Sequence, residues 1–151
     1  MRELLAGVSL KAAAPESLLD REIRGLDYDS RRIGGDSVFF AIRGSRADGA
    51  QFAGEAAGKG AVAVISESPA PGGFAVPWLE VDHVRRALAL MSRNFYRRVA
   101  EKVSLTGITG TNGKSTTAML IDSVLRMAGF TTGLIGTIEY RLAGERLEAV
   151  N

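Results

Sequence analysis

The residue types best suited to chemistry gather in one glycine-rich segment, G-I-T-G-T-N-G-K-S-T at residues 107–116. Glycine allows backbone angles that other residues avoid, so main-chain N–H groups in such a turn can converge on phosphate oxygens. Lys114 would then neutralise charge on the β- and γ-phosphates of ATP, and the Ser115 hydroxyl would be a ligand of Mg²⁺. The segment therefore predicts a phosphate-binding loop that takes ATP and Mg²⁺.

This segment departs from the general phosphate-loop pattern at one position. Ile108 stands where that pattern has glycine, five residues before Gly113, and the spacing becomes G-x-x-G-x-x-G-K-S. A glycine-rich turn with an accidental lysine is the alternative interpretation. The expected strand before the loop, the expected helix after it and the Ser115-Thr116 pair favour phosphate binding.

The elements around the loop predict the first β-loop-α-β unit of a phosphate-loop ATPase domain. An apolar strand is expected over residues 103–109, and a helix from about Lys114 to Ala128, closed by Gly129. Residues 131–135 predict the next strand. Residues 137–150 favour a further strand or hairpin that turns at Ala143-Gly144-Glu145.

The preceding residues predict a small α/β domain over 1–102. The second domain, which starts at residue 103, is expected to be incomplete at residue 151. Strands are expected at 38–42, 61–65 and 78–81, and the continuous apolar runs V-F-F-A-I and A-V-A-V-I are typical of parallel sheets. Helices are expected over 52–59 and from an Asp82 N-cap to about Val99. Val84, Leu88, Met91 and Phe95 should form the buried stripe of that second helix.

The amino-acid composition argues against several classes of protein. The chain has 151 residues, a net charge of +2, no cysteine and a single histidine, His83. These values exclude a disulfide framework and give no metal site based on cysteine or histidine. They also give no support to nucleic-acid binding, and the arginines of the 82–99 region are interpreted as a solvated helix face. No apolar run is long enough to span a membrane, so we expect a soluble cytoplasmic chain.

The departure at Ile108 is itself informative, because T-G-T-N-G-K-S resembles the ATP loop of the Mur ligases and the related folylpolyglutamate synthetases. These enzymes activate a carboxylate as an acyl phosphate, and an amine then displaces phosphate to form an amide. The resemblance implies that ATP binds at the loop and that Ser115 contacts Mg²⁺. The residues implicated in ATP binding are Gly110, Thr111, Asn112, Gly113, Lys114, Ser115 and Thr116.

The front of the chain resembles the uridine-nucleotide-binding domain of two Mur ligase branches, which add the third amino acid and the terminal dipeptide. The matching segments are Asp29-Ser30-Arg31, residues 35–44 and Ala47-Asp48-Gly49. Two alternatives stay open here, because Tyr28 fits either uracil stacking or the core, and Ser30-Arg31 also fits a structural turn. The resemblance implies UDP-sugar contacts at Tyr28, Ser30, Ser45, Arg46 and Ala47.

The segment G-L-I-G-T-I at 133–138 resembles the third-residue branch, and Asn151 matches the first residue of its N-T-T-P substrate segment. The resemblance implies an ATP-dependent ligase that adds diaminopimelate or lysine to UDP-N-acetylmuramoyl-L-Ala-D-Glu in peptidoglycan synthesis. The dipeptide-adding branch and a non-catalytic nucleotide-binding module are the alternatives. Catalytic residues and the Mg²⁺ carboxylate are expected beyond residue 151, so we expect a truncated chain that is inactive alone, with an exposed sheet edge.

Overall fold

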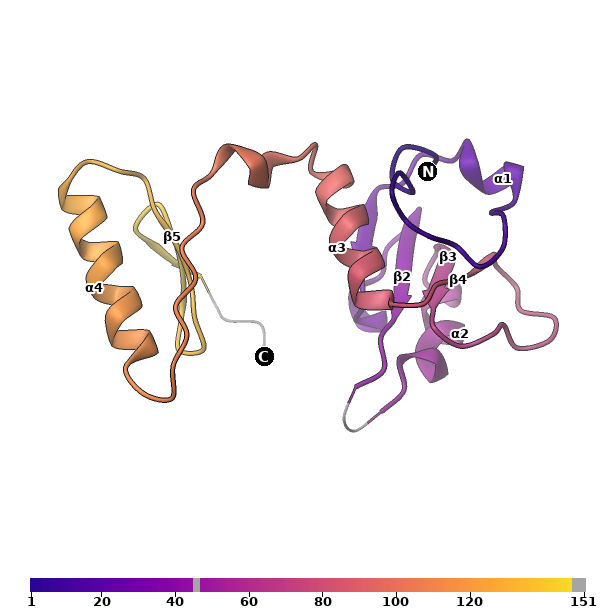
Figure 1. Cartoon of the computed structure of the whole chain (residues 1–151). Coiled ribbons are helices and arrows are strands. Elements are labelled where there is room, and N and C mark those ends of the chain that lie inside the picture. Colours follow the sequence, from indigo (N-terminus) through magenta and orange to yellow (C-terminus); the bar gives the residue numbers. More distant parts are fainter. Residues whose placement is uncertain (45–46, 148–151) are drawn as a thin grey trace. The chain divides into compact units, whose positions relative to one another are not determined.

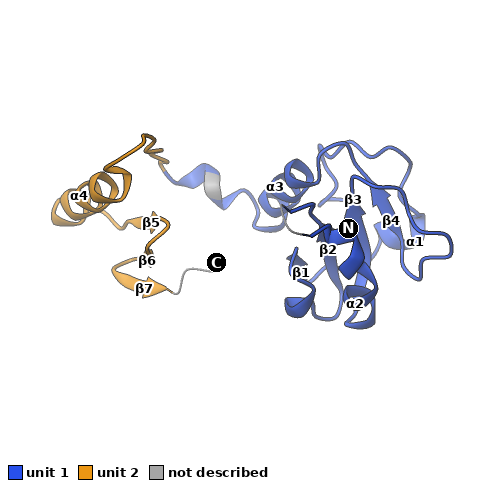
Figure 2. Ribbon diagram, turned by 90° about the horizontal axis from the view of Figure 1, so that it is seen from below, with its two compact units in different colours: residues 1–103 blue, residues 104–151 orange. Residues whose placement is uncertain are grey.

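The computed structural model describes residues 1–44 and 47–147, which belong to two compact units, Met1–Val103 and Ser104–Asn151 (Figures 1 and 2). Both units combine helices with a sheet, as the predicted α/β class requires. Among the described residues, no helix has the length and apolar character needed to cross a membrane.

The first unit is built on a four-stranded parallel sheet in the order β1-β2-β3-β4. Every residue of the two central strands is buried, which confirms the parallel sheet predicted from their continuous apolar runs. The strands are β1 (Gly25–Asp27), β2 (Ser37–Ala41), β3 (Ala61–Ser66) and β4 (Trp78–Glu80).

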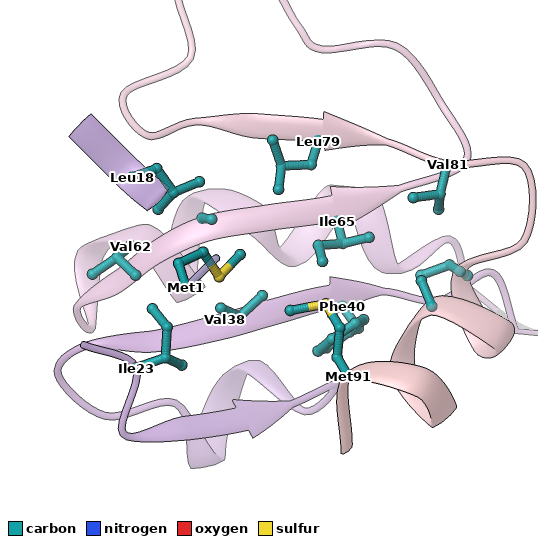
Figure 3. Close-up of a cluster of buried hydrophobic side chains, with 13 residues drawn as sticks. Met1, Leu18, Ile23, Val38, Phe40, Val62, Ile65, Leu79, Val81 and Met91 are labelled. Atoms are coloured by element: carbon teal, nitrogen blue, oxygen red, sulfur yellow. The ribbon is translucent and has the colours of Figure 1, made fainter. Parts of the chain in front are cut away.

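Successive side chains of β2 enter two different cores because strand residues alternate between faces. Val38 and Phe40 join the cluster drawn in Figure 3, whereas Phe39 and Ala41 join a second cluster on the other face. The first core is covered by α3 (Val84–Phe95) and by the N-terminal segment with α1 (Glu16–Leu19). The second core is covered by α2 (Ala53–Gly58).

Three short 3₁₀ turns complete the first unit. They are η1 (Ser30–Arg32), η2 (Gly49–Phe52) and η3 (Val99–Lys102). The first two matter for the site, because α2 packs against both η1 and η2.

Helix α3 is shorter than predicted. It carries the expected apolar stripe, with Val84 and Met91 buried, but its N-cap is His83, so the predicted Asp82 cap is wrong. The Val84 N–H instead donates to Glu67 Oε1 at 2.9 Å, from a residue 17 positions earlier. The α-helix ends at Phe95, and Arg97 and Arg98, which follow it, take left-handed φ values of 52° and 56°.

The second unit contains α4 (Lys114–Met127) and a three-stranded antiparallel sheet. The predicted helix and hairpin are confirmed, and Ala143 and Gly144 form the turn with φ of 50° and 89°. The strand predicted over 103–109 is wrong, because among the described residues no neighbouring strand pairs with this segment. The strands present are β5 (Gly133–Ile135), β6 (Tyr140–Leu142) and β7 (Glu145–Leu147).

Candidate functional site

The glycine-rich loop leads directly into the first turn of α4. Gly110 and Gly113 have φ values of 150° and 77°, and Gly113 is the N-cap of the helix. A side chain at Gly113 would meet no atom within 4 Å, so the φ angle, rather than crowding, makes glycine suitable there. No acidic residue occupies the first helical turn, so the positive end of the helix dipole is left for an anion.

Lys114 is held over this loop by main-chain carbonyls. Its Nζ donates to the carbonyl oxygens of Gly110 at 2.7 Å and Thr111 at 3.3 Å. The ammonium group therefore adds positive charge beside the helix start, where it opposes the dipole of α4 and would favour a bound phosphate. Lys114 is exposed, as are Thr111, Asn112 and Thr116, so the loop is open to a ligand.

Ser115 is half-buried and lines a small hollow between α4, β5 and the loop that joins β5 to β6. The other lining residues are Ala118, Met119, Leu134, Gly136, Ile138 and Glu139. The described residues contain no group of three or more histidine, aspartate or glutamate side chains that could hold a metal. The Ser115 hydroxyl is a hard oxygen donor in the first turn of α4, which fits the coordination that Mg²⁺ prefers.

Two buried carboxylates join α4 to the hairpin, a feature that the sequence did not predict. Asp122 and Glu139 are 5% and 7% exposed. Arg141 pairs with both carboxylates, Arg126 pairs with Asp122 at 3.2 Å, and Arg146 pairs with Glu139 at 3.3 Å. The i,i+4 spacing of Asp122 and Arg126 was the one local signal available in the sequence.

The second set of predicted residues lies at the carboxyl edge of the parallel sheet. Tyr28 and Ser30 follow β1, and the segment containing Ala47 follows β2, the parallel neighbour of β1. Ligands of open parallel sheets bind outside the carboxyl ends of the strands, so this is the expected side for a site. Tyr28 is 55% exposed, which rules out the core-packing interpretation of its ring.

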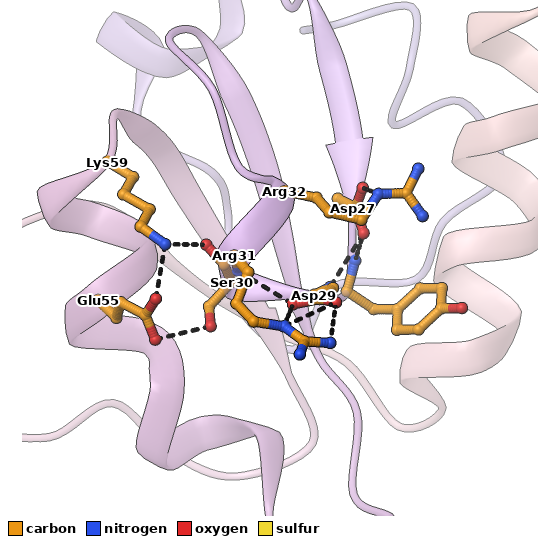
Figure 4. Close-up of polar contacts among 8 residues, drawn as sticks. Asp27, Asp29, Ser30, Arg31, Arg32, Glu55 and Lys59 are labelled. Atoms are coloured by element: carbon orange, nitrogen blue, oxygen red, sulfur yellow. Dashed lines mark hydrogen bonds and ion pairs between the residues drawn. The ribbon is translucent and has the colours of Figure 1, made fainter. Parts of the chain in front are cut away.

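Ser30 is fixed by two hydrogen bonds, to Glu55 and from Lys59, and a third hydrogen bond joins Lys59 to Glu55 (Figure 4). Its hydroxyl donates to Glu55 Oε2 at 2.8 Å. Lys59 Nζ donates to Glu55 Oε1 at 2.7 Å and to the Ser30 carbonyl at 3.2 Å. Sequence reasoning missed Glu55 and Lys59, although their i,i+4 spacing on a helix marks an ion pair.

Two further carboxylates shape the turn around Tyr28. Asp27 Oδ1 accepts from the backbone N–H groups of Tyr28 and Asp29, and Asp29 Oδ1 accepts from the N–H of Arg31. The side-chain hydrogen bonds from Arg31 are the largest cause that lowers the pKa of Asp29 to about 2, and the Arg31 N–H adds to the effect. Asp29 is therefore ionised at neutral pH, and the structural-turn interpretation of Ser30-Arg31 is confirmed. The ligand contact at Ser30 stays a prediction.

The loop after β2 closes through its backbone. The Gly44 N–H donates to the Ala47 carbonyl at 2.9 Å, and the Gly49 N–H donates to the Ile42 carbonyl at 3.1 Å. A Cβ at Gly49 would lie 2.6 Å from two backbone atoms of Ile42, so this close approach requires glycine. The predicted contacts Ser45, Arg46 and Asn151 lie outside the described residues.

The chain belongs to the Mur ligase family. Residues 22–96 match the family model described as "Mur ligase family, catalytic domain", and residues 108–150 match "Mur ligase middle domain". The first match includes Tyr28 and Ser30, and the second includes the whole segment from Gly110 to Thr116.

Particular relatives share both the sequence and the fold. The UDP-N-acetylmuramoyl-L-alanyl-D-glutamate–2,6-diaminopimelate ligase of Solibacter usitatus is 56% identical over 149 residues, which are 99% of this chain and 30% of that protein. The structure of a ligase of the same name is 25% identical with a TM-score of 0.63, over 89% of this chain and 29% of that one. The MurF ligase of Thermotoga maritima in complex with ADP is 28% identical with a TM-score of 0.53, over 75% of this chain and 25% of that one.

Proposed function

We propose that the chain provides the nucleotide-sugar-binding unit and the ATP loop of a ligase that adds diaminopimelate or lysine to UDP-N-acetylmuramoyl-L-Ala-D-Glu. The observation that carries this proposal is the 56% identity over 149 residues to the 2,6-diaminopimelate ligase of Solibacter usitatus. Because the chain spans about 30% of the length of that relative, the activity is proposed for the whole protein.

In this proposal the two units have separate tasks. Tyr28, Ser30 and the 45–47 segment bind the UDP-sugar. The residues from Gly110 to Thr116 bind ATP, with Lys114 stabilising negative charge on the transferring phosphoryl group. Mg²⁺, held in part by the Ser115 hydroxyl, would supply additional neutralisation of phosphate charge.

The reaction class follows from the substrate chemistry. The D-glutamyl carboxylate takes the terminal phosphoryl group of ATP and becomes an acyl phosphate, releasing ADP. An amine of the incoming amino acid then attacks the acyl carbon, and phosphate leaves as the amide forms. The loop contributes binding and electrostatic stabilisation to the first of these steps.

The proposal is tested by calorimetric titration of the 151-residue chain. We expect binding of UDP-N-acetylmuramoyl-L-Ala-D-Glu and, separately, of ATP with Mg²⁺. Lys114→Ala should abolish the ATP signal, whereas Lys102→Ala, an exposed lysine of the other unit, should retain it. A wild-type chain that binds neither compound would overturn the proposal.

The dipeptide-adding branch is a second candidate, favoured by the MurF structures among the similar folds. That enzyme acts after the third residue has been added, so its substrate is the UDP-linked tripeptide. Tighter binding of the UDP-linked dipeptide than of the tripeptide supports the third-residue ligase, and the reverse order supports the alternative.

A further inference from the structure

The hydroxyl of Ser30 is part of a closed hydrogen-bonded triangle with Glu55 and Lys59 (Figure 4). An exposed i,i+4 pair such as Glu55–Lys59 contributes little to helix stability by itself. Here both members of the pair also reach Ser30, one through its hydroxyl and one through its carbonyl. The pair therefore fixes a side chain at the candidate site in addition to stabilising α2.

The direction of the Ser30 hydrogen bond follows from the chemistry of its partner. An ionised carboxylate only accepts hydrogen bonds, so the hydroxyl proton must lie on the side of Glu55. The hydrogen bond from Lys59, followed by the one from Ser30 itself, lowers the pKa of Glu55, which keeps the carboxylate ionised at neutral pH. Ser30 is 6% exposed and held in η1, so its orientation is set by these contacts.

A hydroxyl whose proton is already donated offers only its oxygen lone pairs to a ligand. The group that meets Ser30 must then be a hydrogen-bond donor. Uracil carries a donor, N3–H, between its two carbonyls, whereas the same ring position of cytosine is an acceptor. Tyr28, two residues earlier in the sequence, has an exposed ring, which is a flat surface on which a pyrimidine can stack.

We propose that Glu55 and Lys59 are positioning residues that make the Ser30 hydroxyl an obligate acceptor and thereby select the N3–H of uracil. This inference rests on the proposed function, because it assigns Ser30 to the base of the UDP-sugar. It adds Glu55 on α2 and Lys59, the C-cap of α2, and the effect of both on the ligand passes through Ser30.

The test compares the binding of uridine 5′-diphosphate and cytidine 5′-diphosphate to the 151-residue chain by calorimetry. The wild type should prefer the uridine nucleotide by at least about tenfold, the effect of one hydrogen bond lost against a buried polar group. Glu55→Gln should reduce this preference by about tenfold, because the amide can donate to Ser30 and release the hydroxyl proton toward an acceptor.

Two further variants separate positioning from general stability. Glu22→Gln removes the same charge from another exposed glutamate and should leave the preference at its wild-type value. Ser30→Ala removes the acceptor itself, so it should also reduce the preference, and it provides the test if Glu55→Gln fails to fold. Thermal unfolding of each variant establishes whether it is folded.

The outcomes distinguish this inference from the proposed function. If Glu55→Gln weakened the binding of both nucleotides equally, Glu55 would have only a structural role and the inference would be overturned. A wild type that binds UDP-N-acetylmuramoyl-L-Ala-D-Glu without distinguishing the two diphosphates would also overturn it, while the proposed function would stand. A wild type that binds no uridine compound would overturn both.

Discussion

Thr132 Oγ1 donates a hydrogen bond of 2.5 Å to Asp122 Oδ1, joining the segment before β5 to the helix that carries the glycine-rich loop. Arg126 and Arg141 reach the other oxygen of the same carboxylate at 3.2 and 3.4 Å. Large apolar side chains of this unit, among them Leu120 and Met127, are exposed at 63% and 87%. The polar contacts of Asp122 therefore join α4 to β6 and to the segment before β5 in a unit whose large apolar side chains are mostly exposed.

Replacing Asp122 by alanine should loosen the second unit. The substitution leaves the Thr132 hydroxyl without its acceptor and removes one partner from Arg126 and Arg141, at a cost of about 1–3 kcal/mol. We expect faster amide hydrogen exchange in α4 and β5, with the first unit unchanged. Asp122→Asn keeps an oxygen that accepts from Thr132 and should show a smaller effect. Unaltered protection in Asp122→Ala would contradict this role.

Glu67 should stabilise α3 from outside the helix, because its carboxylate accepts from the Val84 N–H at 2.9 Å. Glu67→Ala leaves this N–H without its cap and should destabilise the first unit by about 1 kcal/mol. Urea unfolding followed by the fluorescence of Trp78, the single tryptophan, measures the effect. Glu67→Gln retains an acceptor and serves as the matched control. If both variants unfold at the same urea concentration, the capping role is wrong.

The sequence predictions that are correct depend on neighbouring residues, whereas the incorrect ones depend on contacts between residues far apart in the sequence. The runs that became β2 and β3 and the stripe from Val84 to Phe95 were predictable, because burial periodicity is local. The cap of α3 was not, because it comes from Glu67 through the tertiary fold. The 103–109 segment has strand-forming composition, but a strand also needs a hydrogen-bonding partner, and local sequence does not specify one.

Some residues of the candidate site could also be predicted from local sequence, whereas others could not. The residues from Gly110 to Thr116 were predicted as a site because phosphate binding needs glycines and a lysine at fixed spacing. Ser30 was identified through a family pattern. Its partners Glu55 and Lys59 are 25 and 29 residues away in sequence, so only the packing of α2 against η1 reveals that they act on it.

The Asp29–Arg31 contact predicts an acid-sensitive contribution to stability. Its folded-state pKa of about 2 lies below the usual unfolded value of about 3.9, so the folded state favours the ionised form. This contribution is present above about pH 4 and is lost as the pH falls toward about 2. Because the Arg31 side chain is 82% exposed, solvent screening keeps the effect small.

Asp29→Asn should therefore lose less stability than the wild type as the pH falls from about 4 to about 2. The variant keeps an oxygen that accepts from the Arg31 N–H but has no charge to titrate. Urea midpoints measured by Trp78 fluorescence across this range give the comparison with the wild type. Asp82→Asn removes a carboxylate that is 74% exposed and should retain the wild-type slope. Parallel curves for wild type and Asp29→Asn would count against the contact.

Gly113 and Gly107 provide a matched pair of positions for testing the glycine-rich loop. Neither would crowd an added Cβ within 4 Å, but only Gly113 is in the left-handed region, with φ of 77°. Gly113→Ala should therefore cost about 1–2 kcal/mol in the loop conformation, which corresponds to roughly tenfold weaker binding of ATP with Mg²⁺.

Gly107→Ala should bind ATP with nearly wild-type affinity, because alanine fits both the space and the backbone angle at that position. Calorimetric titration of the two variants measures the difference, and circular dichroism verifies that α4 is retained. Equal affinities would mean that the left-handed conformation of Gly113 does not form the phosphate site. A selective loss in Gly113→Ala would tie ATP binding to the backbone angle at the start of α4, because the two substitutions add the same methyl group.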